Sequence, residues 1–285
     1  MSDDRSIGPR ARPQRPQGAM LPAEQSLTLV KLGGSLITDK TRPFTPRPDT
    51  LARLAAEIHE ALATRETRPL VVGHGSGSFG HVAAARYRTH EGLVGPDSVR
   101  GWAVVQDAAA RLNRLVVAAL LEADVPAVGV QPSAGCVAVG RRITRWELAP
   151  LRRMLDAGLV PVPYGDVVPD GRQGCAIAST EELFTYLCAA FPVRRVLMVG
   201  QVDGVLRSDG QLVERLTAAD LEELEEELTG AAGVDVTGGM LQKVEYLLAL
   251  ANRGVPSLIL NGDVPGRLRR ALLDKDVIGT AICDA

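Results

Sequence analysis

Short apolar runs alternate with longer stretches of helical periodicity from residue 27 onward. Apolar runs bounded by glycine or proline are typical of buried strands, and apolar residues three or four positions apart are typical of helices. The pattern predicts strands at residues 27–32, 69–72, 126–130, 159–163, 195–199, 257–260 and 277–283. It predicts helices at residues 49–63, 82–87, 98–123, 147–157, 180–190, 218–228 and 240–253. Because continuously apolar strands separated by helices form parallel sheets covered on both faces, we expect an α/β protein, an αβα sandwich.

The first residues do not follow this pattern. Residues 1–25 are rich in Arg, Pro and Gln and have few apolar side chains, so they cannot contribute to a core. We expect residues 1–26 to be a disordered N-terminal extension and residues 27–285 to form a single domain. The extension lacks the apolar segment of a secretory signal peptide.

Composition narrows the functional classes. The formal net charge of −2 gives no basic surface for nucleic acid, so we expect no nucleic-acid partner. No apolar run approaches the roughly 18 residues of a membrane-spanning helix, so we expect no membrane association. The four cysteines have no Cys-x-x-Cys spacing and are expected to be reduced thiols of a cytoplasmic protein.

The most informative segment is the glycine-rich loop after the second predicted strand, Gly73-His74-Gly75-Ser76-Gly77-Ser78-Phe79-Gly80-His81. Glycine lets backbone N–H groups approach an anion because it has no Cβ. The loop ends at His81, where a helical stretch opens, and a helix N-terminus adds unpaired N–H groups and a partial positive charge. The segment therefore predicts a phosphate-binding loop, in which His74 braces the loop instead of contacting substrate.

Two common nucleotide-binding motifs do not explain this loop. Gly75, Gly77 and Gly80 satisfy the G-x-G-x-x-G spacing of dinucleotide-binding loops, but no strand ending in an acidic residue follows about 20 residues later. A Walker A sequence is absent from the chain. The pattern thus disfavours a nicotinamide-dependent enzyme.

Two further loops point to a polyphosphate. Lys31-Leu32-Gly33-Gly34-Ser35 places a lysine in an apolar strand directly before a Gly-Gly turn, and a buried lysine needs an anion nearby. Asp235-Val236-Thr237-Gly238-Gly239-Met240 leads into a helix that carries Lys243. The three loops follow strands, and ligands of parallel sheets bind beyond the carboxyl ends of the strands.

In this order, these segments resemble the motifs of the amino acid kinase superfamily, together with Tyr164-Gly165-Asp166-Val167-Val168 and Val202-Asp203-Gly204-Val205. Within it, Ser78-Phe79-Gly80-His81 and Ser35-Leu36-Ile37-Thr38-Asp39-Lys40 resemble the isopentenyl phosphate kinases. The resemblance extends from residue 27 to the C-terminus. It implies the amino acid kinase fold, an open αβα sandwich with a mostly parallel central sheet. It also implies ATP-dependent phosphorylation of isopentenyl phosphate to isopentenyl diphosphate, Mg²⁺ carried largely by the nucleotide, and a homodimer.

The resemblance also implies residue roles. Catalytic roles fall to Lys31, His81, Glu181 and Lys243, of which His81 selects a phosphate acceptor. The residues expected to bind ATP are Lys31, Gly33, Gly34, Ser35, Lys40, Ser179, Asp203, Gly204, Gly238, Gly239 and Lys243. Those expected to bind the acceptor are Gly75, Ser76, Gly77, Gly80, His81, Gly165 and Asp166. We expect no metal ligand from the protein, because the sequence has no metal-ligand cluster.

Two segments depart from the family pattern and leave alternatives open. Ser179-Thr180-Glu181-Glu182 has Glu181 where the family usually has an aspartate that orients the catalytic lysines. Gly200-Gln201-Val202-Asp203-Gly204 stands where the family commonly has Thr-Asp-Val-Asp-Gly. One alternative is a kinase of another small alkyl phosphate or a phosphonate. The other is a non-catalytic nucleotide-binding sensor with the same fold.

Overall fold

The structure is a computed structural model that describes residues 26–64, 69–221 and 239–284. The extension predicted to be disordered lies outside the described residues except for Ser26, as does most of the helix predicted at residues 218–228. In the described ranges, strands and helices alternate from β1 onward as the sequence predicts, with additional strands described below.

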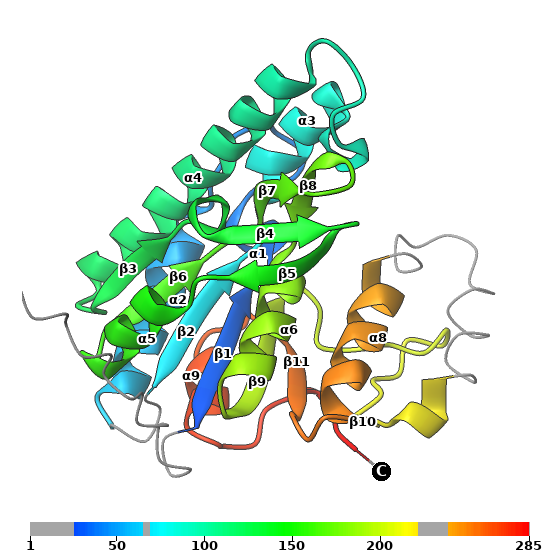
Figure 1. Cartoon of the computed structure of the whole chain (residues 1–285). Coiled ribbons are helices and arrows are strands. Elements are labelled where there is room, and N and C mark those ends of the chain that lie inside the picture. Colours follow the sequence, from blue (N-terminus) through cyan, green and yellow to red (C-terminus); the bar gives the residue numbers. More distant parts are fainter. Residues whose placement is uncertain (1–25, 65–68, 222–238, 285) are drawn as a thin grey trace, which may run out of the picture.

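A six-stranded sheet forms the centre of the molecule (Figure 1). Its strands in spatial order are β10 (Arg215–Leu216), β12 (Gly279–Ile282), β11 (Ser257–Asn261), β9 (Val193–Gly200), β1 (Leu27–Leu32) and β2 (Leu70–His74). Neighbouring strands are parallel, except that β11 and β12 pair antiparallel. The parallel pair β3 (Ala127–Val130) and β6 (Val160–Pro163) adjoins β2 through a bridge between His74 and Tyr164. The mostly parallel central sheet is therefore confirmed.

The sequence pattern does not predict the second sheet. Its four strands in order are β5 (Arg142–Trp146), β4 (Cys136–Val139), β7 (Asp166–Asp170) and β8 (Gly174–Ala178). Strands β4 and β5 form one antiparallel hairpin, and β7 and β8 form another. Three of the five residues of β5 are exposed, so this strand lacks the continuous apolar run on which the prediction depends. Asp170 joins the turns of the two hairpins by accepting hydrogen bonds from the backbone N–H groups of Gly140, Arg141, Arg172 and Gln173.

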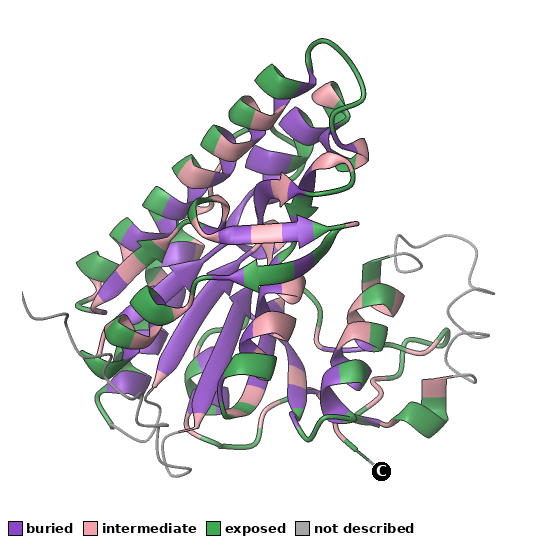
Figure 2. Ribbon diagram, in the orientation of Figure 1, coloured by how far each residue is buried: buried purple, intermediate pink, exposed green. Residues whose placement is uncertain are grey.

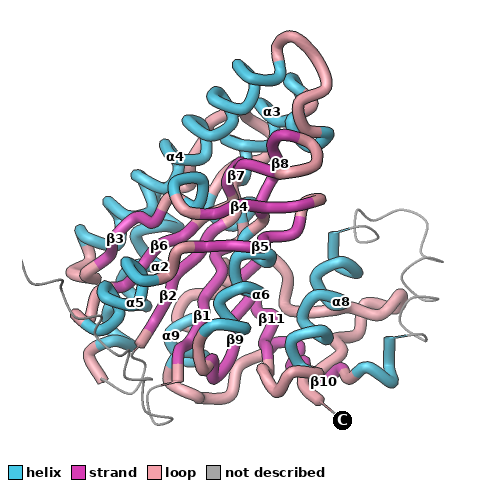
Figure 3. The backbone as a smooth tube through the Cα atoms, in the orientation of Figure 1, coloured by secondary structure: helices cyan, strands magenta, loops and turns pink. Residues whose placement is uncertain are grey.

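Helices cover both faces of the central sheet (Figure 3). One face carries α2 (Pro48–Leu62), α4 (Ser98–Glu122) and α9 (Arg267–Leu272), and the other carries α5 (Ala149–Asp156), α6 (Thr180–Ala190) and α8 (Gly239–Ala251). Two more helices, α1 (Gly34–Ile37) and α3 (Gly77–Tyr87), begin at the first two glycine loops. Helix α6 has the predicted bounds, whereas α9 is not predicted and α3 begins at Gly77, five residues before its predicted start at residue 82.

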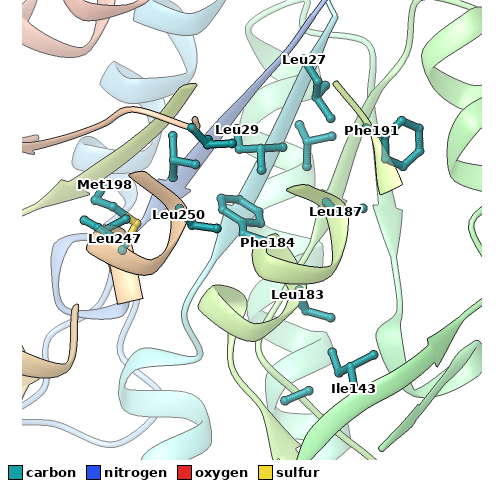
Figure 4. Packing of buried hydrophobic residues seen from close by; sticks show 14 of the residues in the cluster. Leu27, Leu29, Ile143, Leu183, Phe184, Leu187, Phe191, Met198, Leu247 and Leu250 are labelled. Atoms are coloured by element: carbon teal, nitrogen blue, oxygen red, sulfur yellow. The ribbon is translucent and has the colours of Figure 1, made fainter. Parts of the chain in front are cut away.

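Two hydrophobic clusters hold the layers together because successive side chains of a strand point to opposite faces of the sheet. Leu29 of β1 belongs to the cluster beneath α6 and α8, as does Phe184 of α6 (Figure 4). Its neighbour Val30 belongs to the cluster beneath α2 and α4. The central strands are buried along most of their length (Figure 2). By the same alternation, Lys31 lies on the face of Leu29, and its side chain is directed toward α6 and α8.

Candidate active site

Lys31 is buried near the carboxyl end of β1, with 8% of its surface exposed. Its Nζ donates a hydrogen bond to Oε1 of Glu181, in the first turn of α6. Ser179 caps this helix, since its Oγ accepts a hydrogen bond from the N–H of Glu182 at 3.1 Å. The predicted Lys31 and Glu181 are therefore in direct contact, and the helix N-terminus adds favourable potential for the carboxylate.

The charge of Glu181 is set by opposing effects. Burial raises the pKa of its carboxyl group, while the charge of Lys31, the hydrogen bond from Lys31 and the charge of Lys243 lower it. The lowering effects prevail, so the pKa of Glu181 lies below its usual value. Glu181 is consequently an anion at neutral pH, facing two lysines.

Lys243 lies in the second turn of α8, and its environment disfavours its charge. Burial lowers the pKa of Lys243, the nearby charges of Lys31 and Lys40 lower it further, and Glu181 opposes this shift. Lys31, Lys40 and Lys243 thus lie near one another, and Glu181 balances part of their charge. The positive charge gathered at this point favours the binding of a polyanion.

These lysines line a cavity of about 350 Å³ at the carboxyl ends of β1 and β9. Its polar lining comprises Lys31, Lys40, Lys243 and the glycines Gly33, Gly200 and Gly239, and its apolar lining comprises Met198, Val202, Met240 and Ile259. A lining that combines cationic groups with apolar side chains suits a nucleotide, whose phosphates are charged and whose base is flat and largely apolar.

The first two glycine loops touch each other beside this cavity. A Cβ on Gly34 would lie 2.5 Å from the backbone nitrogen of Gly77, so only glycine fits here. Gly77 itself has a φ of +49°, a left-handed conformation that favours glycine. The hydroxyl of Thr38 connects the loops, donating to the carbonyl of Gly34 at 2.6 Å and accepting from the N–H of Ser78 at 2.9 Å. The sequence does not predict this role of Thr38, because Ser78 lies 40 residues further along the chain.

Not all glycines of these loops have a free N–H group. The N–H groups of Gly33, Gly75 and Gly80 donate to the carbonyls of Val199, Leu32 and Ser76, respectively. Within the described ranges, no acceptor is found for the N–H groups of Gly34, Ser35, Ser76 and Gly77. These four groups are therefore the donors that the loops offer to an anion, and the other three glycines serve close packing.

His81 lies in the second turn of α3, because this helix starts at Gly77 and not at the histidine. His81 is partly exposed to solvent. Partial burial lowers the pKa of His81, and the charge of Lys40 lowers it further. The neutral imidazole can donate one hydrogen bond, and a bound phosphate would favour its protonation.

The structure places three predicted residues in other contacts. The carboxylate of Asp166 is buried and accepts hydrogen bonds from the N–H groups of Ser133 at 2.9 Å and Val167 at 2.8 Å. Asp203 pairs with Arg267 of α9, and this hydrogen bond is the main reason that its pKa is lowered. The neighbouring Gly204 is buried, and a Cβ there would lie 2.3 Å from the hydroxyl of Thr280. Asp203 and Gly204 thus hold the segment after β9, whose residues 200–202 line the cavity, whereas Asp166 holds the turn at Ser133.

Gly165 approaches the second loop. Its N–H group donates to the carbonyl of His74 at 3.1 Å, and a Cβ on Gly165 would lie 3.8 Å from the nitrogen of Ser76. Gly238, together with Asp235 and Thr237, lies outside the described residues.

In the described part of the chain, no three His, Cys, Asp or Glu side chains converge as a metal site would require. Among the same residues, no helix has the length and apolar character needed to cross a membrane.

The chain is similar to known phosphotransferases along most of its length. Residues 26–261 match the model of the amino acid kinase family. The chain is 38% identical over 270 residues to isopentenyl phosphate kinase from Methanothermobacter thermautotrophicus, covering 90% of this chain and 98% of that protein. It is 38% identical to isopentenyl phosphate kinase from Haloferax volcanii, covering 86% of this chain and 99% of that protein. A solved structure of isopentenyl phosphate kinase superposes with a TM-score of 0.75 at 34% identity, covering 90% of this chain and 100% of the other.

Proposed function

Since the chain belongs to the amino acid kinase family, we propose that it transfers the terminal phosphoryl group of ATP to isopentenyl phosphate, giving isopentenyl diphosphate and ADP. The observation that carries this proposal is the cluster of Lys31, Glu181 and Lys243, whose two lysines line the cavity at the end of β1, the strand that leads into the first glycine loop. We propose that a donor phosphate in the cavity faces an acceptor phosphate at the glycine loops.

Each side chain has a defined task in this reaction. In phosphoryl transfer, charge spreads over the equatorial oxygens of the moving group, and catalysis consists mainly of positioning and charge stabilisation. Lys31 and Lys243 supply the positive charge, and Glu181 holds Lys31 in position. The free N–H groups of Gly34 and Gly77 face the region where the loops meet. His81 donates a hydrogen bond to the acceptor phosphate, a contact that a carboxylate acceptor would not require.

Mg²⁺ would accompany the nucleotide. This ion dehydrates reluctantly and commonly binds through substrate phosphates with few protein carboxylates, and such binding fits a cavity rich in lysines. The ion would neutralise phosphate charge that the lysines do not reach. We also propose that the protein works in the cytoplasm as a homodimer without a nucleic-acid partner. Light scattering after size-exclusion chromatography tests the dimer.

The direct test is release of ADP from Mg²⁺-ATP with and without isopentenyl phosphate, with the product identified by ³¹P NMR. We expect acceptor-dependent ADP release and the two phosphorus signals of a diphosphate monoester. Release with butyl phosphate or a small phosphonate, but not with isopentenyl phosphate, would favour the alternative acceptor. Binding of ATP without acceptor-dependent release from any of these would favour the sensor. The Lys31→Ala variant serves as the control for background hydrolysis.

A further inference from the structure

His74, the last residue of β2, contacts α6 and the segment of Tyr164 and Gly165. It is fully buried, with 0% of its surface exposed. Its carbonyl accepts hydrogen bonds from the hydroxyl of Thr180 at 2.7 Å and from the N–H of Gly165 at 3.1 Å. Its ring stacks on Tyr164, with centroids 5.7 Å apart and planes 10° apart. The backbone of His74 therefore ties the second glycine loop to α6, the helix that carries Glu181.

The contacts of the ring fix which nitrogen carries the hydrogen. The side-chain nitrogen of Asn113 lies 3.0 Å from the carbonyl oxygen of Val162 and 3.1 Å from Nε2 of His74. A carbonyl oxygen only accepts, so this atom of Asn113 is the amide NH₂, and Nε2 must be the acceptor. The hydrogen therefore resides on Nδ1, which donates to the carbonyl oxygen of Gly75 at 3.0 Å. Burial lowers the pKa of His74 to about 4, so this neutral form persists at physiological pH.

The bond to Gly75 controls the next peptide group. In a trans peptide, the carbonyl of one residue and the N–H of the following residue point in opposite directions. Holding the Gly75 carbonyl toward the buried ring thus directs the N–H of Ser76 away from it, and this N–H has no acceptor among the described residues. A peptide next to glycine turns easily because glycine has little steric restriction, so its orientation needs an external constraint.

We propose that His74 is a positioning residue that orients the Ser76 N–H as a preformed donor to the acceptor phosphate. This inference rests on the proposed kinase activity. It assigns the two histidines of the loop different tasks: His81 contacts the acceptor, and His74 sets the backbone donor beside it.

Two substitutions separate this role from simple packing. His74→Asn puts an amide N–H near the position of Nδ1 and keeps the bond to Gly75, but it leaves Asn113 without its acceptor. His74→Gln reaches the position of Nε2 and keeps an acceptor for Asn113, but it loses the bond to Gly75. Both lose the ring stacked on Tyr164, so both should lower the melting temperature to a similar extent.

The measurements are kcat, KM for isopentenyl phosphate, melting temperature and the ¹⁵N–¹H shift of the Ser76 amide on adding isopentenyl phosphate. We expect kcat to stay within about threefold of wild type for His74→Asn. For His74→Gln we expect a loss of at least about tenfold, toward the 10²–10³-fold typical of a lost oxyanion donor. The Ser76 shift should be lost only in His74→Gln. Equal kcat values for the two variants, or a Ser76 shift in both, would overturn the proposal.

Two further measurements test the proposal if the wild type is inactive or if the variants do not fold. If the wild type shows no turnover, the proposed function fails, and the Ser76 shift on adding inorganic phosphate then decides the role of His74. If neither variant folds, Asn113→Ala provides another test. It keeps the imidazole of His74 but removes the N–H donor to Nε2, so the ring hydrogen is no longer restricted to Nδ1. It should then lower kcat severalfold and weaken the Ser76 shift, and an unchanged kcat and shift would contradict the proposal.

Discussion

Lys31 and Glu181 form a direct ion pair although 150 residues separate them in the chain. The pair joins the end of β1 to the first turn of α6, at the wall of the nucleotide-sized cavity. The family resemblance leads us to expect the shorter aspartate at this position, and the side chain of Glu181 reaches the lysine directly. Glu181 therefore supplies Lys31 with a carboxylate partner despite this departure from the expected pattern.

The first prediction concerns this pair. Glu181→Gln keeps the size of the side chain but removes the charge that holds Lys31, so we expect kcat to fall by about 10²-fold, as a misplacement of about 1 Å can cause. Glu181→Asp draws the carboxylate back by one methylene and should give an intermediate kcat. Steady-state kinetics with isopentenyl phosphate measure both.

Glu182→Gln is the matched control, because it neutralises the next carboxylate of the same helical turn. Glu182 accepts a hydrogen bond from the N–H of Ile143 at 3.0 Å and lies near Arg142, so its loss should affect packing of α6 on β5. We expect a lower melting temperature with little change in kcat. A similar loss of kcat in both variants would mean that the charge of Glu181 has no specific role.

The second prediction is that ATP binding takes up protons at alkaline pH through Lys243. Burial and the charges of Lys31 and Lys40 hold the pKa of Lys243 below the usual value of a lysine. Between the lowered pKa and that usual value, Lys243 is partly neutral in the folded protein, and we expect a bound triphosphate to raise its pKa again. In that pH range the unfolded state binds more protons, so the contribution of Lys243 to the free energy of unfolding rises with pH.

Calorimetry with a non-hydrolysable ATP analogue, in two buffers of different ionisation enthalpy, measures the proton uptake. Lys243→Met should abolish most of it and weaken binding, while Lys275→Met, which removes an exposed lysine, should change neither. Unchanged uptake in Lys243→Met would assign the proton to another group.

The third prediction concerns His81 and Lys40. Partial burial lowers the pKa of His81, and the charge of Lys40 contributes to the shift. Lys40→Gln should therefore raise the pKa of His81, and adding isopentenyl phosphate to the wild type should raise it as well. NMR titration of the His81 ring protons gives both values, with Lys275→Gln as the control lysine variant. If Lys40→Gln leaves the pKa unchanged, the two side chains do not interact in solution.

Apart from the two-residue β10, the strands of the central sheet are predictable because they are largely buried and appear in the sequence as continuous apolar runs, as in residues 27–32. The β4–β5 and β7–β8 hairpins are not predictable in this way. Strands β4, β5 and β8 each include exposed positions, and β7 has aspartate at both ends and a proline between them. The early start of α3 also escapes prediction, because glycine favours loops unless tertiary contacts hold it, and here Thr38 holds the first turn through Ser78.

The residues of the candidate site also fall into those that the sequence reveals and those that it does not. Lysines and glycines beside strand ends are visible in the sequence, and the structure places Lys31, Lys243 and Glu181 close together. Residues that act through distant partners give no local signal. The hydroxyl of Thr180, for example, donates to a carbonyl 106 residues away.

The last prediction tests the contact between the two glycine loops. Gly34→Ala would place a Cβ 2.5 Å from the nitrogen of Gly77, a backbone atom that cannot rotate away, so the loops must separate. A separation of about 1 Å at the reacting groups can cost about 10²-fold in rate, so we expect kcat/KM for isopentenyl phosphate to fall by this order. Gly95→Ala is the matched control, because nothing lies within 4 Å of a Cβ at that position. It should leave kcat/KM and the melting temperature unchanged. If Gly34→Ala keeps wild-type kcat/KM, the close approach of the loops is not required for transfer, and the donors of Gly34 and Gly77 act independently.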